Sequence, residues 1–485
     1  MSVLTSQLDL LIREGKIATA TAAITKMNLA KVPRKQRQEL AKICRRVGLI
    51  GKGLRLLQPV IRHQHPLAQP PSAGEICEYA VLLSRNGSID EALGLLKEVR
   101  SNQAPEALLY QGFLNVSNWD YSSALKCFTK FLQTNPDDYM ALIAQVNLNA
   151  SLIETGQLDN AESSILSTIE IARERGATRL IGNAFELLAQ VHFQRHDFPA
   201  ARTALNSALE IFAQGQSYDR ILVEKWLAFI TAQEQKSVTP LLRFRKQAIR
   251  ERHWHSVREV DYMTLQFFFN QNTFDHLYYG TPMKAYRTRL IEKTSASPSS
   301  QFEWGPKNWE VLIGLNDGRC EGCPSLKTGG KTHQVLVALS SDLYEPSNTG
   351  RLFGLLYPGE YFDVESSPLR IRQALRRTRG WLEANRLPVS LAHGKSGYKI
   401  NIEGKLAFGF SSAPHAIHPR ETQRTLLLEK FPPGRWFATN EAMELLNCSR
   451  SSFHRFAEDA RAGGWLLIQG KGKSVRYQFT QSSAD

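Results

Sequence analysis

Hydrophobic positions in the first 215 residues recur at helical spacing, in blocks separated by short turns. A short motif marks these turns: a glycine or a substitute, any residue, an apolar residue, two further residues, and a small residue. Its final small residues are Ala20, Gly53, Ala92, Ala124, Ala161 and Ala201. They lie 33, 39, 32, 37 and 40 positions apart. A period between about 20 and 50 residues indicates stacked supersecondary units.

The residue types of the motif explain a turn between two helices. A glycine ends the first helix in a conformation that a side chain resists, and the small residue lets the second helix approach closely. The fullest match lies in 105–138, with Gly112 in one helix and Ala124 and Phe128 in the next. This pattern resembles the tetratricopeptide repeat, over the region 1–215. The resemblance implies an α-solenoid whose concave face binds a peptide or protein, or joins two copies of the chain.

Residues 216–294 keep a helical pattern with interleaved aromatic and basic residues. The stretch RFRKQAIRERHWHSVR could contact nucleic acid, but we expect the segment to cap the solenoid and connect it onward. Serines and a proline at 295–301 predict a linker.

From residue 302 the pattern changes to short strand-like pieces, three helices and a hairpin. The helices are expected near 332–344, 348–356 and 367–385, the last with Ser367 as its N-cap. Its apolar face holds Ile371, Ala374, Leu375, Thr378 and Leu382. Its basic side holds Arg370, Arg372, Gln373, Arg376, Arg377 and Arg379. Arg and Gln can pair bidentately with base edges in the major groove, and flanking arginines can reach phosphates.

The stretch HGKSGYKI, residues 393–400, contains the last letters of a phosphate-binding loop. The position that should hold the first glycine of such a loop is Val389, and the residues that follow alternate as a strand. We therefore predict a hairpin. Its tip, with His393 and Lys395, can lie along the adjacent DNA backbone or minor groove, and Tyr398 packs the foot of the hairpin against the helix.

Residues 302–405 resemble the DNA-binding output domain of response regulators of the OmpR/PhoB type. In that family a long recognition helix precedes a wing that ends in Gly-x-Gly-Tyr. This chain has an extra residue between Gly394 and Gly397, and Thr378 stands where an apolar residue is usual. The resemblance implies a winged helix that binds double-stranded DNA.

A second unit, residues 420–480, follows an expected linker at 406–419. Its string A-x-x-L-L-x-x-S-R-S-S-F-x-R resembles the helix-turn-helix of many bacterial regulators, with Thr439 in a capping position. We expect Phe453, Phe456, Ala457 and Ala460 to face inward. The candidates for DNA contact are Arg450, Ser451, Ser452, His454, Arg455, Lys471, Lys473 and Arg476.

The candidate residues divide into two roles. Phosphate contacts, whose affinity falls with salt, are expected from Arg370, Arg372, Arg379, Lys395, Lys471 and Lys473. Base contacts are expected from Gln373, Arg376, Arg377, Ser451 and Arg455.

The net charge of +14 is unevenly distributed between the two halves of the chain. Residues 1–240 hold 26 Lys and Arg against 23 Asp and Glu, whereas residues 241–485 hold 34 against 23. An excess of positive charge in one half points to a polyanion partner for that half, although a solvated basic surface gives the same count.

Other chemistry finds little support in the sequence. Cys320 and Cys323 form a C-x-x-C, but a structural zinc needs two more ligands and His333 is the sole near candidate. There is no G-x-S-x-G and no motif of paired carboxylates, so we expect no enzyme, cofactor or metal. Six cysteines and the absence of an apolar run of membrane-spanning length favour a reducing cytoplasm and no membrane partner.

The sequence thus predicts a mainly α protein, a TPR-like α-solenoid followed by two α+β winged-helix (helix-turn-helix) domains. The function expected is a DNA-binding transcription regulator whose repeats receive a peptide, a protein or a second copy. The alternative is a scaffold whose winged helices bind proteins, and a weaker one is a nucleotide-driven signalling ATPase.

Overall fold

The computed structural model describes residues 3–13, 16–62, 69–213, 219–394, 396–411, 419–446, 448–470 and 475–480. They divide into two compact units, Met1–Leu277 with Met283–Ala296, and Tyr278–Pro282 with Ser297–Asp485. The predicted class is confirmed, because a helical repeat region precedes a mixed portion with small sheets. None of the described helices is both long and apolar enough to cross a bilayer.

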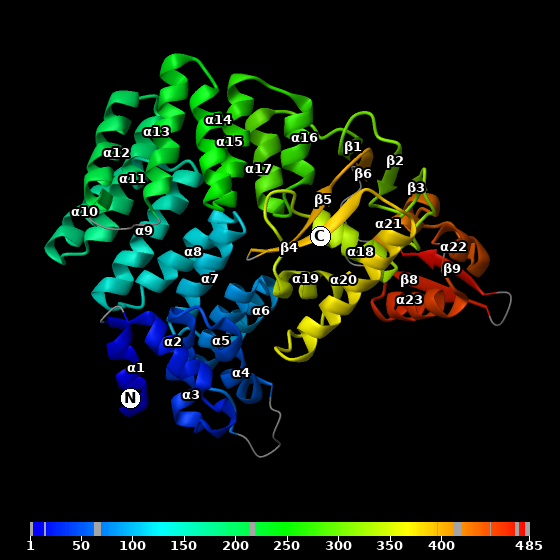
Figure 1. Ribbon diagram of the computed structural model, residues 1–485, viewed down its shortest axis with the longest axis horizontal. Helices are drawn as coiled ribbons and strands as arrows, with labels where there is room; N and C mark the ends of the chain where they lie inside the picture. Colours follow the sequence, from blue (N-terminus) through cyan, green and yellow to red (C-terminus); the bar gives the residue numbers. More distant parts are fainter. Residues whose placement is uncertain are drawn as a thin grey trace. The chain divides into compact units, whose positions relative to one another are not determined.

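The first unit is built from helices that follow one another in pairs (Figure 1). From α1 to α14 each first helix packs on the second helix of its pair, and α15 packs on α14. The helices are α1 (Val3–Arg13), α2 (Ile17–Lys26), η1 (Leu29–Lys31), α3 (Arg34–Arg46), α4 (Ile50–Ile61), α5 (Ala73–Asn86), α6 (Ile89–Glu98), α7 (Glu106–Ser117), α8 (Tyr121–Leu132), α9 (Asp138–Glu154), α10 (Leu158–Glu174), α11 (Thr178–Gln194), α12 (Phe198–Ala213), α13 (Arg220–Gln235), α14 (Thr239–Arg250), α15 (Trp254–Phe267), α16 (Gln271–Tyr279) and α17 (Lys284–Thr294).

The repeat register predicted from the turn motif is confirmed. The apolar residue of each motif is the first residue of a second helix, from Ile17 in α2 to Phe198 in α12. Every motif alanine is completely buried, and a Cβ at Gly53 would lie 2.8 Å from a methyl group of Leu82. Small residues are therefore required where the second helix meets its neighbours.

The glycine position of the motif adopts a left-handed backbone with or without glycine. Gly48, Gly87 and Gly156 have φ of 77°, 94° and 79°, but Trp119 and His196 have 61° and 62°. The two substitutes in the motif therefore adopt the same left-handed turn as the glycines. Gly15 lies outside the described residues.

A helix cap accompanies both substitutes. Asp120 follows Trp119 and accepts a hydrogen bond from the Ser123 amide at 3.0 Å. Asp197 follows His196 and accepts one from the Ala200 amide at 3.0 Å. A left-handed non-glycine residue costs about 1–2 kcal/mol, and a side-chain cap contributes about 1 kcal/mol, so each aspartate offsets much of the cost.

Residues 219–294 are helical, as expected, and continue the array of helices beyond α12. Lys236 and Arg252 take the same left-handed turn, with φ of 48° and 60°, between α13, α14 and α15. First helices also pack on the first helix of the next pair, from α3 on α5 to α13 on α15. The surface formed by the first helices is therefore the inner, concave side of the array.

The second unit begins with a module that contains two separate sheets. Its elements are β1 (Gln301–Trp304), β2 (Val311–Gly314), β3 (Cys320–Glu321), α18 (Lys331–Ser340), α19 (Thr349–Leu356), α20 (Ser366–Ala384), β4 (Val389–Gly394), β5 (Gly397–Ile402) and β6 (Leu406–Ser411). We call residues 301–411 module 1. A four-stranded sheet has the order β1-β6-β2-β3, and β4 and β5 form an antiparallel hairpin.

Two expected linkers contribute to this sheet, and both predictions were wrong in part. Residues 406–411, assigned to a linker at 406–419, form the central strand β6, antiparallel to β1 and parallel to β2. Gln301, assigned to the linker at 295–301, begins β1. Tyr279, which groups with the second unit, stacks on Phe302 with ring centroids 5.5 Å apart.

A second module, residues 419–480, follows. Its elements are α21 (Pro419–Lys430), β7 (Phe437–Ala438), α22 (Thr439–Leu445), α23 (Arg450–Ala462), β8 (Leu466–Gln469) and β9 (Arg476–Phe479). We call it module 2; its three-stranded sheet has the order β7-β9-β8. Aromatic residues dominate its core, with Phe431, Phe437, Phe453 and Tyr477 all buried.

Two predicted helix caps are displaced. Ser367 is the second residue of α20, and its hydroxyl accepts a hydrogen bond from the Asp363 amide at 2.9 Å instead of capping the helix. Thr439 is the first residue of α22, and the capping position belongs to Ala438, whose amide donates to the Glu441 carboxylate at 2.7 Å.

Candidate functional sites

The long basic helix α20 has two chemically distinct faces. Its inward face is buried as predicted, with Ile371, Ala374, Leu375, Thr378 and Leu382 all at most 2% exposed. The Thr378 hydroxyl donates to the Ala374 carbonyl oxygen at 3.1 Å. This bond satisfies the hydroxyl inside the core, so a threonine is tolerated at a position where an apolar residue is usual.

The outward face carries Arg372, Gln373, Arg376 and Arg377, and all four residues are exposed. Within the described part of the chain, no hydrogen bond or ion pair engages their side chains. Within α20 the one glutamate, Glu383, stands near the C-terminal end, and Glu365 precedes the first residue of the helix. The face therefore presents unneutralised guanidinium groups and one amide to solvent.

Arg370 and Arg379 have internal partners that the sequence pattern missed. The Arg370 guanidinium bonds Glu360 through both Nη atoms, at 2.5 and 2.9 Å, and lies 3.8 Å from the centre of the Tyr357 ring. The hydrogen bonds from Arg370 lower the pKa of the Glu360 carboxyl. Arg379 Nη2 donates to the Leu391 carbonyl oxygen at 2.9 Å, which joins α20 to β4. Both arginines hold module 1 together, and their predicted phosphate contacts stay predictions.

The hairpin beside α20 is fixed at its base. The Tyr398 and Ser347 backbones exchange two hydrogen bonds of 2.8 Å, and the Tyr398 ring stacks on His393 with centroids 4.2 Å apart. Gly397 has φ of 127°, and a Cβ there would lie 2.5 Å from the Ser347 carbonyl oxygen, so glycine is required. His393 is exposed, while Lys395 lies outside the described residues.

In module 2 the predicted inward residues of α23 are buried, with Phe453 and Ala460 completely so. On its outer side Arg450, Ser451 and Arg455 are exposed and His454 is half-buried. Arg455 Nε donates to the Ser451 carbonyl oxygen at 3.4 Å, and Arg476 lies 3.9 Å from Glu441. The side chain of Ser452, together with Lys471 and Lys473, lies outside the described residues.

The two cysteines of the C-x-x-C are joined by no further metal ligand in the described part of the chain. His333, the expected third candidate, is buried and uses both ring nitrogens: Nδ1 accepts from the Gly329 amide and Nε2 donates to the Leu315 carbonyl oxygen, each at 3.0 Å. Burial raises the pKa of the Cys320 thiol to about 12. Among the described residues no cluster could hold a metal ion.

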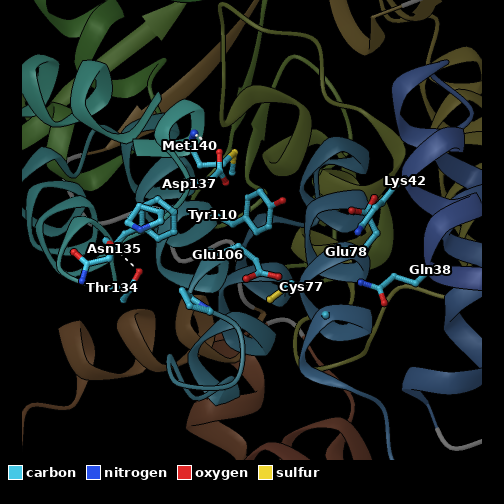
Figure 2. Close-up of a pocket in the computed structure, with 14 residues that line it drawn as sticks. Gln38, Lys42, Cys77, Glu78, Glu106, Tyr110, Thr134, Asn135, Asp137 and Met140 are labelled. Carbon is cyan, nitrogen blue, oxygen red and sulfur yellow. Dashed lines mark hydrogen bonds between the residues drawn. The ribbon is translucent and has the colours of Figure 1, made fainter. Parts of the chain in front are cut away.

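A pocket of about 350 Å³ opens on the concave surface of the repeats (Figure 2). First helices of four successive pairs line it, with Lys42 from α3, Glu78 from α5, Tyr110 from α7 and Met140 from α9. Glu78 pairs with Arg45 at 2.8 Å; burial nevertheless raises the pKa of the Glu78 carboxyl. The sequence predicted a ligand-binding concave face but identified none of these residues.

A second polar cluster occupies the concave surface further along the array. Lys225 of α13 is buried and pairs with Glu259 of α15 at 2.8 Å. α17 also contributes: Tyr286 packs edge-on against Trp119 with centroids 4.8 Å apart, and Arg289 pairs with Glu154 of α9. These contacts connect α15 to α13, and α17 to the fourth and fifth pairs, within the first unit.

Comparison with known proteins finds that part of this chain is similar to a described domain. Residues 77–194 match the model of a domain of unknown function, DUF7017, which covers less than half of the chain. No curated protein matches the sequence.

Solved structures with similar folds are helical-repeat proteins. A Rap protein complexed with competence and sporulation factor is 12% identical, with 60% of this chain and 86% of that chain covered and a TM-score of 0.42. A tetratricopeptide repeat protein from Parabacteroides merdae is 15% identical, with 60% and 98% covered and a TM-score of 0.34. A signal transduction ATPase with a tetratricopeptide repeat sensor from Pyrococcus horikoshii is 12% identical, with 78% and 52% covered and a TM-score of 0.37.

Proposed function

We propose that the protein is a sequence-specific transcription regulator that binds double-stranded DNA through modules 1 and 2, each acting as a winged helix. The observation that carries the proposal is the outward face of α20, where exposed Arg372, Gln373, Arg376 and Arg377 have no partner among the described residues. Charged groups held in solvent on a rigid helix are available to an external anion.

The dimensions and chemistry of α20 suit the major groove of DNA. A helix of 19 residues is about 28 Å long, and a major groove about 12 Å wide admits an α-helix. Arg pairs bidentately with guanine and Gln with adenine, each pair being worth about 1–3 kcal/mol of discrimination. Arg376, Arg377 and Gln373 would supply these pairs, and Arg372 would reach a phosphate.

The repeats would receive the regulating partner, a peptide, a protein or a second copy of the chain. Support comes from the concave pocket, whose lining combines apolar and aromatic groups with the carboxylates of Glu78 and Glu106. Mixed linings of this kind give both burial and orientation to a bound segment.

The proposal is tested by selecting duplexes from a random pool with the intact protein, followed by binding measurements at several salt concentrations. We expect one sequence to be enriched and to bind at least tenfold more tightly than a scrambled duplex. The affinity for both should fall as salt rises, because phosphate contacts release counterions.

The competing proposal is a scaffold whose modules bind proteins. It predicts that no duplex is enriched and that binding at moderate salt is the same for every sequence. That result would remove the regulator proposal.

A further inference from the structure

One apolar side chain interrupts the polar outward face of α20. Leu369 is 58% exposed. Among the described residues of module 1, Tyr361 is the only other large hydrophobic residue that is exposed. A single exposed leucine is common on protein surfaces, so its position on the helix decides whether it has a role.

Leu369 lies in the middle of the proposed DNA-reading face. Arg372, Gln373, Arg376 and Arg377 follow it by three, four, seven and eight residues. At about 100° per residue these side chains fall within roughly 80° of Leu369 around the helix axis. Leu369 is also in the first turns of α20, and the N-terminal residues of a recognition helix are those that reach base edges.

An aliphatic side chain at that position has one apolar partner in unmodified DNA. Hydrogen-bond donors and acceptors make up the major-groove edges of guanine, cytosine and adenine, whereas thymine also presents its C5-methyl group. We infer that Leu369 is a specificity-determining residue that contacts a thymine methyl group through its isobutyl side chain. This inference rests on the proposed DNA-binding function and names one base that the helix reads.

The position of the thymine relative to the other contacts follows from helix geometry. Gln373 lies one turn after Leu369, so their Cβ atoms are about 6 Å apart. Successive bases along a strand rise by about 3.4 Å. The thymine should therefore lie about two base pairs from the adenine that Gln373 reads.

The test uses the selected duplex with each thymine replaced, one at a time, by deoxyuridine, which removes the methyl group and keeps every hydrogen-bonding group. From the burial of one methyl group we expect a single replacement to lower the affinity of the intact protein for the duplex about fourfold. The Leu369→Ala variant should bind the thymine duplex more weakly than the parent protein does, by a similar factor. It should bind the thymine and deoxyuridine duplexes equally well. Gln373→Ala should instead relax the preference for the neighbouring adenine.

Leu242→Ala is the matched control, because Leu242 is a 47% exposed leucine on α14 in the repeats. This variant should keep the fourfold difference. Melting curves of both variants show whether each folds like the parent protein, as expected for an exposed leucine replaced by a good helix former.

Two results would overturn the inference while leaving DNA binding intact. One is a selected duplex on which no deoxyuridine replacement weakens binding. The other is a Leu369→Ala variant that still discriminates thymine from deoxyuridine at every position. A failure to enrich any duplex would instead reject the proposed function itself, and this inference with it.

Discussion

The third helices of the two C-terminal modules share a burial pattern but differ in charge. α20 carries five arginines and one glutamate, whereas α23 carries three arginines, one glutamate and one aspartate. The glutamate of α20 stands near its end, but the exposed Glu458 of α23 lies on the same side as Ser451 and Arg455. A carboxylate at this position repels a phosphate backbone.

The difference shows that the apolar pattern and the charge pattern carry separate information. Both inward faces specify a helix packed on a small core, and either module could form with any exposed residues on the other side. The outward residues decide what such a module can bind. Under the proposed function, module 1 supplies most of the affinity and sequence preference, and module 2 contributes less.

The largest effect should come from removing the two adjacent arginines of α20. Arg376→Ala combined with Arg377→Ala deletes two bidentate base contacts, so the selected duplex should be bound on the order of 100-fold more weakly. Arg455→Ala in module 2 should cost about tenfold or less. Fluorescence anisotropy with selected and scrambled duplexes measures both.

The control for charge is Arg243→Ala combined with Arg250→Ala, which removes two exposed arginines from α14. Its effect should be small and equal on both duplexes. A loss after Arg376→Ala and Arg377→Ala that is also equal on both duplexes would show that these residues do not read bases.

Replacing one glycine in each module with alanine should destabilise module 1 more than module 2. Gly397→Ala places a Cβ against the Ser347 carbonyl oxygen in a left-handed backbone, and we expect a loss of about 3 kcal/mol. Gly464→Ala, with φ of 74° and open space around the added atom, should cost about 1–2 kcal/mol. Hydrogen exchange of the intact variants, followed at peptides from each module, locates the destabilised region; equal effects would contradict the close contact at Gly397.

A smaller effect is expected on the salt dependence of DNA binding, which should change more after a substitution in module 1 than after one in module 2. Arg372→Ala removes one expected phosphate contact and should lower the slope of log K against log salt by about one. Arg476→Ala should change the slope less, because this arginine lies near Glu441. A slope that Arg372→Ala leaves unchanged would exclude a phosphate contact by that residue.

The smallest predicted effect concerns the Arg370–Glu360 pair. Arg370 lowers the pKa of Glu360, so the pair stabilises module 1 above the ordinary carboxyl range near about 4.3 and loses this effect as the pH falls through the lowered pKa. Since both side chains are partly exposed, the contribution should be less than about 1 kcal/mol.

Thermal unfolding of the parent protein and of Glu360→Gln tests this dependence. The parent should be slightly more stable at pH 6, and the difference should shrink as the pH falls through the lowered pKa of the Glu360 carboxyl. Glu441→Gln in module 2 is the matched control. A difference that stays the same at every acidic pH would show that the pair is not its source.

Local patterns in the sequence were sufficient to predict the repeats and both buried helix faces. Ala124 and Ala161 identify points of close helix approach, and Leu375 and Phe456 follow the helical period. The burial of these residues can therefore be predicted from the residues near them in the sequence. The same pattern placed Trp119 and His196 in turns but did not identify the following aspartate caps, which offset the cost of a left-handed residue.

Long-range pairing is what the sequence did not reveal. Strand β6 pairs with β2 across about 95 residues, and nothing in its own short apolar run distinguishes a central strand from a linker. The engagement of Arg370 with Glu360 and of Arg379 with Leu391 is likewise invisible in helical periodicity, because each partner belongs to another element. The concave pocket escaped prediction for the same reason, since five helices each supply one or a few of its lining residues.

The central place of β6 has a consequence for synthesis of the protein on the ribosome. Strands β1 and β2 do not pair with each other, and β1 has β6 as its sole partner in the sheet order. A nascent chain that ends at residue 405 therefore displays open strand edges, although all three helices of module 1 have already been made. The sheet can close only after residue 411 has left the exit tunnel, so a translational pause before that point would prolong the exposure of an aggregation-prone edge.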